Sequence, residues 1–170
     1  MSSSIVCVDA SFVARLFMGP DEDRAWELFD SWVDQGTVIH APTLLAYELT
    51  NVLHRYHRAG YLSAVSTELV LDAIASLPLT LDSHHSLDRS ALRIAADADL
   101  PATYDAYYLA LAKRYDAHLW TADRRLAAGA GEYKSRVQLL GESATIPDAL
   151  DGRSALEPSR RAIWRGGRAA

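Results

Sequence analysis

Four acidic side chains stand beside apolar stretches of this chain: Asp9, Glu48, Asp105 and Asp123. Each lies next to a segment whose composition predicts a core strand or helix. Ionised carboxylates are rarely placed near a core unless something there compensates their charge. The simplest compensator is a divalent cation, because carboxylate oxygens are the hard ligands that Mg²⁺ and Mn²⁺ prefer. The four acids therefore predict a metal-assisted site that hydrolyses phosphate esters.

Two of the acids follow predicted strands. Residues 5–8 form a short run rich in β-branched side chains that ends at Asp9, and residues 118–121 form a similar run two residues before Asp123. In an open α/β sheet, ligands bind in the crevice outside the carboxyl ends of the strands. We therefore expect Asp9 and Asp123 to reach one crevice.

The other two acids lie on predicted helices. Asp105 falls in the first turn of a helix over residues 103–115, where the helix dipole favours a carboxylate. Glu48 falls inside a predicted helix over residues 42–58. Leucines surround it in the sequence, so we expect Glu48 to lie close to the core side of that helix. Brought together, four acids would repel strongly, which raises one or more pKa values or demands a cation.

Each acid also has an ordinary structural interpretation. Asp105 could be a first-turn helix residue only, Asp123 could cap the short helix that follows it, and Glu48 could face solvent. Asp9 is the stronger candidate, because an acid directly after a buried strand is often functional in α/β proteins.

The remaining pattern alternates short apolar strands with helices and predicts an α/β/α sandwich around a central parallel sheet of about five strands. Further strands are predicted at residues 37–40, 79–81 and 137–140, and further helices at 12–17, 21–35, 63–76, 86–98 and 123–128. We expect Pro42 to begin its helix, a position that suits proline.

Composition limits the class of protein. The chain has 170 residues, 49% hydrophobic, with a formal net charge of −5, which argues mildly against passive nucleic-acid packaging. Cys7 is the only cysteine, so neither an intrachain disulfide nor a cysteine zinc site is possible. No signal peptide or membrane span is predicted, and we expect a cytoplasmic protein.

The composition changes near Pro147. We expect a nuclease domain over residues 1–147 and an Arg-rich tail over 148–170, where five arginines face three acids. The tail is interpreted as weakly structured, or alternatively as an arm that clamps a partner or RNA.

The local sequences around the four acids resemble the PIN-domain ribonucleases, most closely the VapC-type toxins of bacterial toxin–antitoxin pairs. The matching stretches occur in the family's order at residues 8–11, 48–53, 103–112 and 119–124. The resemblance implies a Mg²⁺- or Mn²⁺-dependent endoribonuclease that acts on RNA, binds a cognate antitoxin protein and forms a homodimer.

The resemblance also implies roles for individual residues. Asp9, Glu48, Asp105 and Asp123 match the acidic metal-site positions of the family. Asp9 and Asp105 would hold the principal metal, and Glu48 and Asp123 would ligate through water or position the nucleophile. The supporting positions are matched by Ser11, Asn51 and Thr121.

Two features of these matches leave questions open. Asn51 could be an ordinary surface amide. Arg124 and Arg125 stand where some members of the family carry a further acid, which could weaken a second metal site or supply phosphate contacts.

Three alternatives remain at this point. The chain could be a PIN nuclease of RNA processing, or a non-catalytic PIN-like module that binds RNA or an antitoxin. A phosphohydrolase with Asp9 as covalent nucleophile is disfavoured, because Ser11 stands where such enzymes carry a second acid.

Aromatic residues give weaker signals. Tyr104, Tyr107 and Tyr108 flank Asp105 and are interpreted as core or interface more readily than as base-stacking residues. Tryptophans in the predicted helix 21–35 fit either the core or a partner surface.

Overall fold

The computed structural model describes residues 4–141, so the predicted tail at 148–170 lies outside the described residues. Its centre is a five-stranded parallel sheet in the order β3-β2-β1-β4-β5. The strands are β1 (Ile5–Val8), β2 (Val38–Pro42), β3 (Leu79–Asp82), β4 (His118–Thr121) and β5 (Val137–Leu139). The predicted fold class, an α/β/α sandwich, is confirmed.

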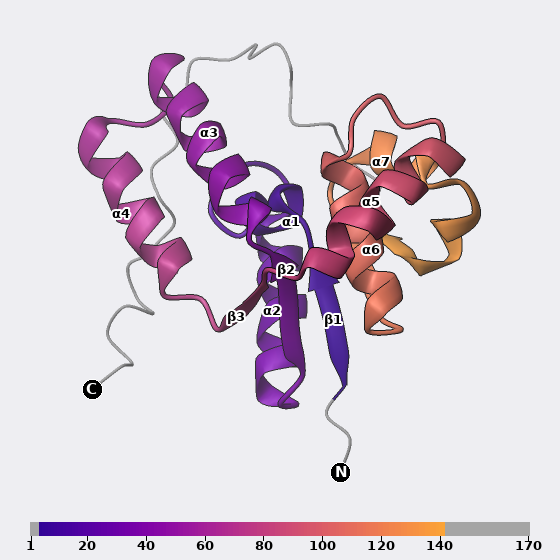
Figure 1. The fold of residues 1–170 in the computed structure, drawn as a ribbon. Helices are drawn as coiled ribbons and strands as arrows, with labels where there is room; N and C mark the ends of the chain where they lie inside the picture. The colour runs from indigo at the N-terminus through magenta and orange to yellow at the C-terminus, as the bar shows by residue number, and fades with distance from the viewer. Residues whose placement is uncertain (1–3, 142–170) are drawn as a thin grey trace.

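Helices cover both faces of the sheet (Figure 1). They are α1 (Ala10–Arg15), α2 (Glu22–Asp34), α3 (Leu44–Arg58), α4 (Ala64–Ala75), α5 (His85–Asp97), α6 (Tyr104–Arg114) and α7 (Arg124–Gly129), with a 3-10 helix η1 (Gly131–Arg136). Parallel strands are joined by right-handed crossovers. The path from β1 to β3 therefore places α1–α4 on one face, and the return to β4 and β5 places α5–α7 on the other.

The direction of the chain across the sheet reverses beside β1. Cys7 pairs with His40 of β2 on one side and with Leu119 of β4 on the other. The carboxyl ends of β1 and β4 therefore meet at the topological switch point, where open α/β sheets place their ligands.

The core is built on both faces of β1. Helix α6 packs across β1, β2 and β4, and α5 packs on α6. On the opposite face Trp26 and Trp32 of α2 are buried, and the Trp26 Nε1 donates to the Leu16 carbonyl at 2.6 Å. These tryptophans belong to the core rather than to a partner surface. Among the helices of residues 4–141, none combines the length and apolarity that a membrane crossing needs.

The structure corrects the predicted starts of two helices. Pro42 ends strand β2, in register with Asp82 of β3, and the helix starts after Thr43. Proline lacks an N–H group and has a fixed φ, properties that suit the end of a strand as well as the start of a helix. Helix α1, on the same face as α3, begins at Ala10, directly after Asp9 and earlier than predicted.

Candidate functional site

Three hydrogen bonds hold the side chain of Asp9. Its side chain caps α1: Oδ1 accepts the Phe12 backbone N–H at 2.8 Å and the Ser11 hydroxyl at 2.7 Å, while Oδ2 accepts the Thr121 hydroxyl at 2.5 Å. Asp9 is 4% exposed. This capping role, which the sequence analysis missed, explains why α1 starts so close to the strand.

The two hydroxyls join the ends of β1 and β4. Ser11 Oγ lies 3.1 Å from Thr121 Oγ1 and accepts the Ala122 backbone N–H at 2.8 Å. Thr121 Oγ1 in turn accepts the Asp123 backbone N–H at 2.9 Å. The network fixes the loop that carries Asp123 against the carboxylate of Asp9.

The groups that donate hydrogen bonds to the Asp9 carboxylate carry no positive charge. Burial raises the pKa of Asp9 to about 7, although the three hydrogen bonds from Thr121, Phe12 and Ser11 act in the opposite direction. The negative charge of Asp123 raises this pKa further. All three donors are neutral groups, so nothing in the network supplies the positive charge that a buried carboxylate requires.

Asp123 serves as the N-cap of α7. Its Oδ1 accepts the backbone N–H groups of Arg125 at 2.7 Å and Leu126 at 3.4 Å, and the Arg125 guanidinium lies 3.5 Å from Oδ2. The ordinary interpretation of this residue is therefore realised in the structure. It does not remove the carboxylate from the site, because Asp123 still acts electrostatically on both Asp9 and Asp105.

Glu48 and Asp105 come from the helices on opposite faces of the sheet. Glu48 is partly buried and accepts a short hydrogen bond from the Tyr108 hydroxyl. Burial raises its pKa against that hydrogen bond, and the charge of Asp105 raises it as well. The pKa of Asp105 is raised by burial and then by Asp123, while Arg125 opposes the shift. Each acid thus feels the charge of at least one other.

The structure brings the four acids into electrostatic contact without a closed ligand cage. Within residues 4–141, no group of three or more His, Cys, Asp or Glu side chains stands close enough to hold a metal ion as drawn. The residues nevertheless fit a hard divalent cation by their chemistry. All the donors are carboxylate oxygens, and burial together with the charge of a neighbouring acid raises the pKa values of Asp9, Glu48 and Asp105.

The supporting positions differ in their surroundings. Ser11 and Thr121 contact Asp9 directly, whereas Asn51 is exposed on α3, one turn from Glu48. Tyr108 is buried, as the sequence analysis favoured, but its role as the partner of Glu48 was missed. A tyrosine inside an apolar helix requires a partner for its hydroxyl, which was the available signal.

Residues 6–132 match the family model described as the PIN domain. The chain is similar to Ribonuclease VapC3 of Pyrobaculum aerophilum (strain ATCC 51768 / DSM 7523 / JCM 9630 / CIP 104966 / NBRC 100827 / IM2), with 32% identity over 122 residues. That alignment covers 71% of this chain and 90% of the relative.

A solved structure is similar as well. The crystal structure of PAE2754 from Pyrobaculum aerophilum superposes with a TM-score of 0.56 and 26% sequence identity. The match covers 76% of this chain and 86% of that one. The family match over residues 6–132 includes all four acids.

Proposed function

Because the chain belongs to the PIN-domain family as a VapC-type protein, we propose that it is a metal-dependent endoribonuclease, the toxin of a type II toxin–antitoxin pair. The relative VapC3 is named a ribonuclease, and the acidic site of this chain has the chemistry that phosphodiester hydrolysis requires. The observation that carries the proposal is Asp9, a buried carboxylate at the switch point that has only neutral donors and a neighbouring acid.

We assign the metal ligands to Asp9, Asp105 and Asp123, with Mg²⁺ or Mn²⁺ as the ion. Their oxygens are hard donors, and a cation among them would offset the burial and the repulsion from Asp123 that raise the pKa values of Asp9 and Asp105. When bound, such an ion polarises the scissile phosphate and lowers the pKa of a water molecule.

The other residues of the site position these groups. Ser11 and Thr121 hold the Asp9 carboxylate in one orientation through hydrogen bonds to its two oxygens. We assign to Glu48, whose carboxylate accepts the Tyr108 hydroxyl, the role of ligating the ion through water or positioning the attacking water. Asn51 would contact the RNA from the exposed side of α3.

The partners of the proposal follow the same assignment. The substrate is RNA, with Arg124 and Arg125 beside Asp123 available as phosphate contacts. The regulator is a cognate antitoxin protein, the protein acts as a homodimer in the cytoplasm, and residues 1–147 form the nuclease domain. Residues 148–170 carry the excess of arginine and would contribute to binding a partner or RNA.

The test is cleavage of total RNA by the purified full-length chain in Mg²⁺, in Mn²⁺ and in EDTA. Asp9→Asn and Asp105→Asn remove one proposed ligand each. Asp97→Asn is the matched control, since it removes the same charge from an exposed position at the end of α5. Circular dichroism establishes that each variant is folded.

Discrete RNA products that need the metal and are lost in both ligand variants, but not in Asp97→Asn, are expected. Cleavage that persists in EDTA would exclude the metal mechanism. RNA binding without cleavage in any metal, from folded and antitoxin-free protein, would favour the non-catalytic module. Metal-dependent cleavage without an antitoxin gene adjacent to the coding sequence would favour a nuclease of RNA processing.

A further inference from the structure

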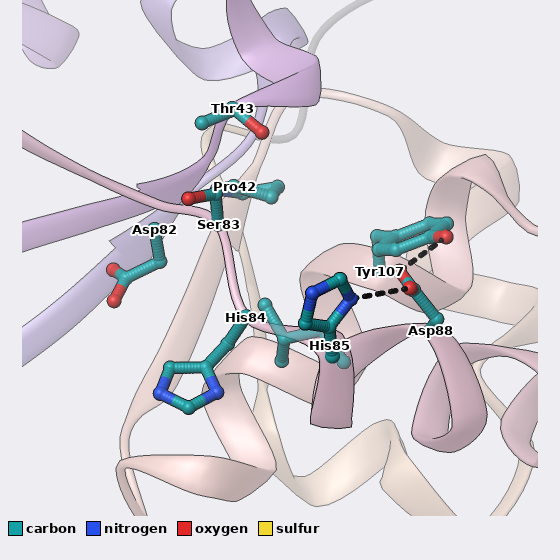
Figure 2. Close-up of a pocket in the computed structure, with 9 residues that line it drawn as sticks. Pro42, Thr43, Asp82, Ser83, His84, His85, Asp88 and Tyr107 are labelled. Carbon is teal, nitrogen blue, oxygen red and sulfur yellow. Dashed lines mark hydrogen bonds and ion pairs between the residues drawn. The ribbon is translucent and has the colours of Figure 1, made fainter.

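A cavity lies at the carboxyl ends of β2 and β3, and none of the residues around Asp9 line it (Figure 2). Its volume is about 270 Å³. The residues that line it include Pro42, Thr43, Ser83, His85, Asp88 and Tyr107. The roles assigned to the acidic site use none of them.

The cavity shares two structural elements with the acidic site. Thr43, on the cavity wall, directly precedes α3, which carries Glu48. Tyr107, on the opposite wall, belongs to α6 and directly precedes Tyr108, the partner of Glu48. The cavity therefore adjoins the two helices that carry the Glu48–Tyr108 pair.

Asp88 lies beside two aromatic side chains of the cavity, Tyr107 and His85. Tyr107 donates its hydroxyl to Asp88 Oδ1 at 3.0 Å, and His85 Nδ1 lies 3.9 Å from Asp88 Oδ2. Figure 2 shows these three side chains pointing toward one another. The side chain of Asp88 is 60% exposed, and a carboxylate accepts about four hydrogen bonds, so most of its acceptor capacity is free for a ligand. The two rings offer flat faces beside it.

The other carboxylate at the cavity is already engaged. Asp82 Oδ2 lies 2.6 Å from His40 Nδ1, and Asp82 Oδ1 accepts the Tyr115 hydroxyl at 2.7 Å. In Figure 2 Asp82 stands apart from the group formed by His85, Asp88 and Tyr107. Asp82 is therefore part of the wall, and Asp88 is the group that can contact a ligand.

We propose that this cavity binds a guanine base of the RNA, next to the phosphate that is cleaved, with the Asp88 carboxylate accepting hydrogen bonds from the base. The inference rests on the proposed nuclease function and adds a substrate specificity to it. Single-stranded RNA is recognised by bases that leave the stack, lie against aromatic rings and present their Watson–Crick edge. Guanine presents two adjacent N–H donors on that edge, which match the two oxygens of a carboxylate. The carbonyl oxygens of uracil would be repelled.

The test measures binding where the proposed metal chemistry cannot occur. Fluorescent pentanucleotides with a central guanine, adenine, cytosine or uracil in a uridine background are titrated in EDTA with the full-length chain, and anisotropy is recorded. The variant is Asp88→Asn, whose amide directs a donor at the donors of guanine. Asp97→Asn is the control, with the same charge change at an exposed position of the same helix.

Guanine is expected to bind about tenfold more tightly than uracil, the order found for a bidentate contact to a base. Asp88→Asn should reduce that ratio to about one while Asp97→Asn keeps it. A wild-type chain without guanine preference, or a preference retained in Asp88→Asn, would overturn the inference. Guanine preference without metal-dependent cleavage would overturn the nuclease and leave the base site standing. Cleavage without guanine preference would do the reverse.

Discussion

Two aspartates at the carboxyl ends of strands in the same sheet, Asp9 and Asp82, have different kinds of hydrogen-bond partner. Asp9 follows β1 and receives hydrogen bonds from two hydroxyls and one backbone N–H, all neutral. Asp82 ends β3 and contacts the imidazole of His40 and the phenol of Tyr115. The rings of His40 and Tyr115 stack with centroids 4.2 Å apart, which closes that side of the carboxylate.

The two carboxylates differ in the groups that contact them: neutral donors for Asp9, and an imidazole and a phenol for Asp82. Asp82 has an aromatic base within hydrogen-bonding distance, and its two oxygens are engaged. Asp9 has only neutral donors, and burial and the charge of Asp123 raise its pKa to about 7. Position at a strand end alone therefore does not single out Asp9, and its proposed role rests on its neutral donors and on the neighbouring Asp123.

The largest expected effect is on cleavage. Asp9→Asn should lower metal-dependent RNA cleavage by about 10³-fold, because the loss of a metal ligand removes several kcal/mol of transition-state stabilisation. Asp82→Asn should leave the rate at saturating RNA near that of the wild type. The measurement is the initial rate in Mg²⁺ with each protein shown to be folded. Equal losses in both variants would mean that the two carboxylates do not differ in role.

The next effect is a pH dependence of stability in the metal-free protein. The pKa of Asp9 is about 7 in the folded chain against an ordinary value of 3.8. Between these values the folded chain keeps a proton that the unfolded chain has lost. The contribution of Asp9 to stability therefore falls as pH rises from about 4 to about 7. Between pH 5 and pH 8 the loss is about 3 kcal/mol.

Urea denaturation in EDTA at pH 5 and pH 8 measures this loss. The free energy of unfolding of Asp9→Asn, relative to wild type, should increase between the two pH values, because an amide does not titrate. Added Mg²⁺ at pH 8 should stabilise the wild type and have little effect on Asp9→Asn. A difference between the proteins that is constant with pH would show that Asp9 is already ionised without a cation.

The local features of this comparison could be predicted from the sequence. Apolar runs predicted β1 and β4, beside Asp9 and Asp123, with the bounds that the structure shows, because a short buried strand is marked by a local run of apolar residues. The prediction that Pro42 begins a helix was wrong. Proline suits both the end of a strand and the start of a helix, and only the pairing of Pro42 with β3 shows that it belongs to the strand.

The long-range partners could not be predicted. Thr121 contacts Asp9 from 112 positions away, and Tyr108 contacts Glu48 from 60 positions away. No short pattern encodes which hydroxyl reaches which carboxylate. The cavity around Asp88 was missed for the same reason, because it exists only where α5 packs on α6 behind the end of β3.

A smaller effect on the stability of the protein is expected when the contact between His40 and Asp82 is broken. The side chains of His40 and Asp82 are 9% and 13% exposed, so breaking their contact leaves a largely buried polar group without its partner. His40→Ala should lower the free energy of unfolding by about 2 kcal/mol, from a lost hydrogen bond to a charged group. Chemical denaturation near neutral pH measures it. Tyr115→Phe, which removes only the hydroxyl at the other oxygen, should cost less.

The smallest effect tests whether the hydroxyls around Asp9 orient it or only stabilise it. Ser11→Ala removes one donor to Oδ1 but keeps the Phe12 N–H on the same oxygen, so the stability cost should be about 1 kcal/mol. Ser11 also accepts the Ala122 N–H and thereby holds the loop that leads to Asp123. We therefore expect the apparent Mg²⁺ affinity in cleavage assays to weaken, while the maximal rate at saturating metal changes less. An unchanged affinity with a lower maximal rate would place Ser11 in the reaction itself rather than in the positioning of Asp9 and Asp123.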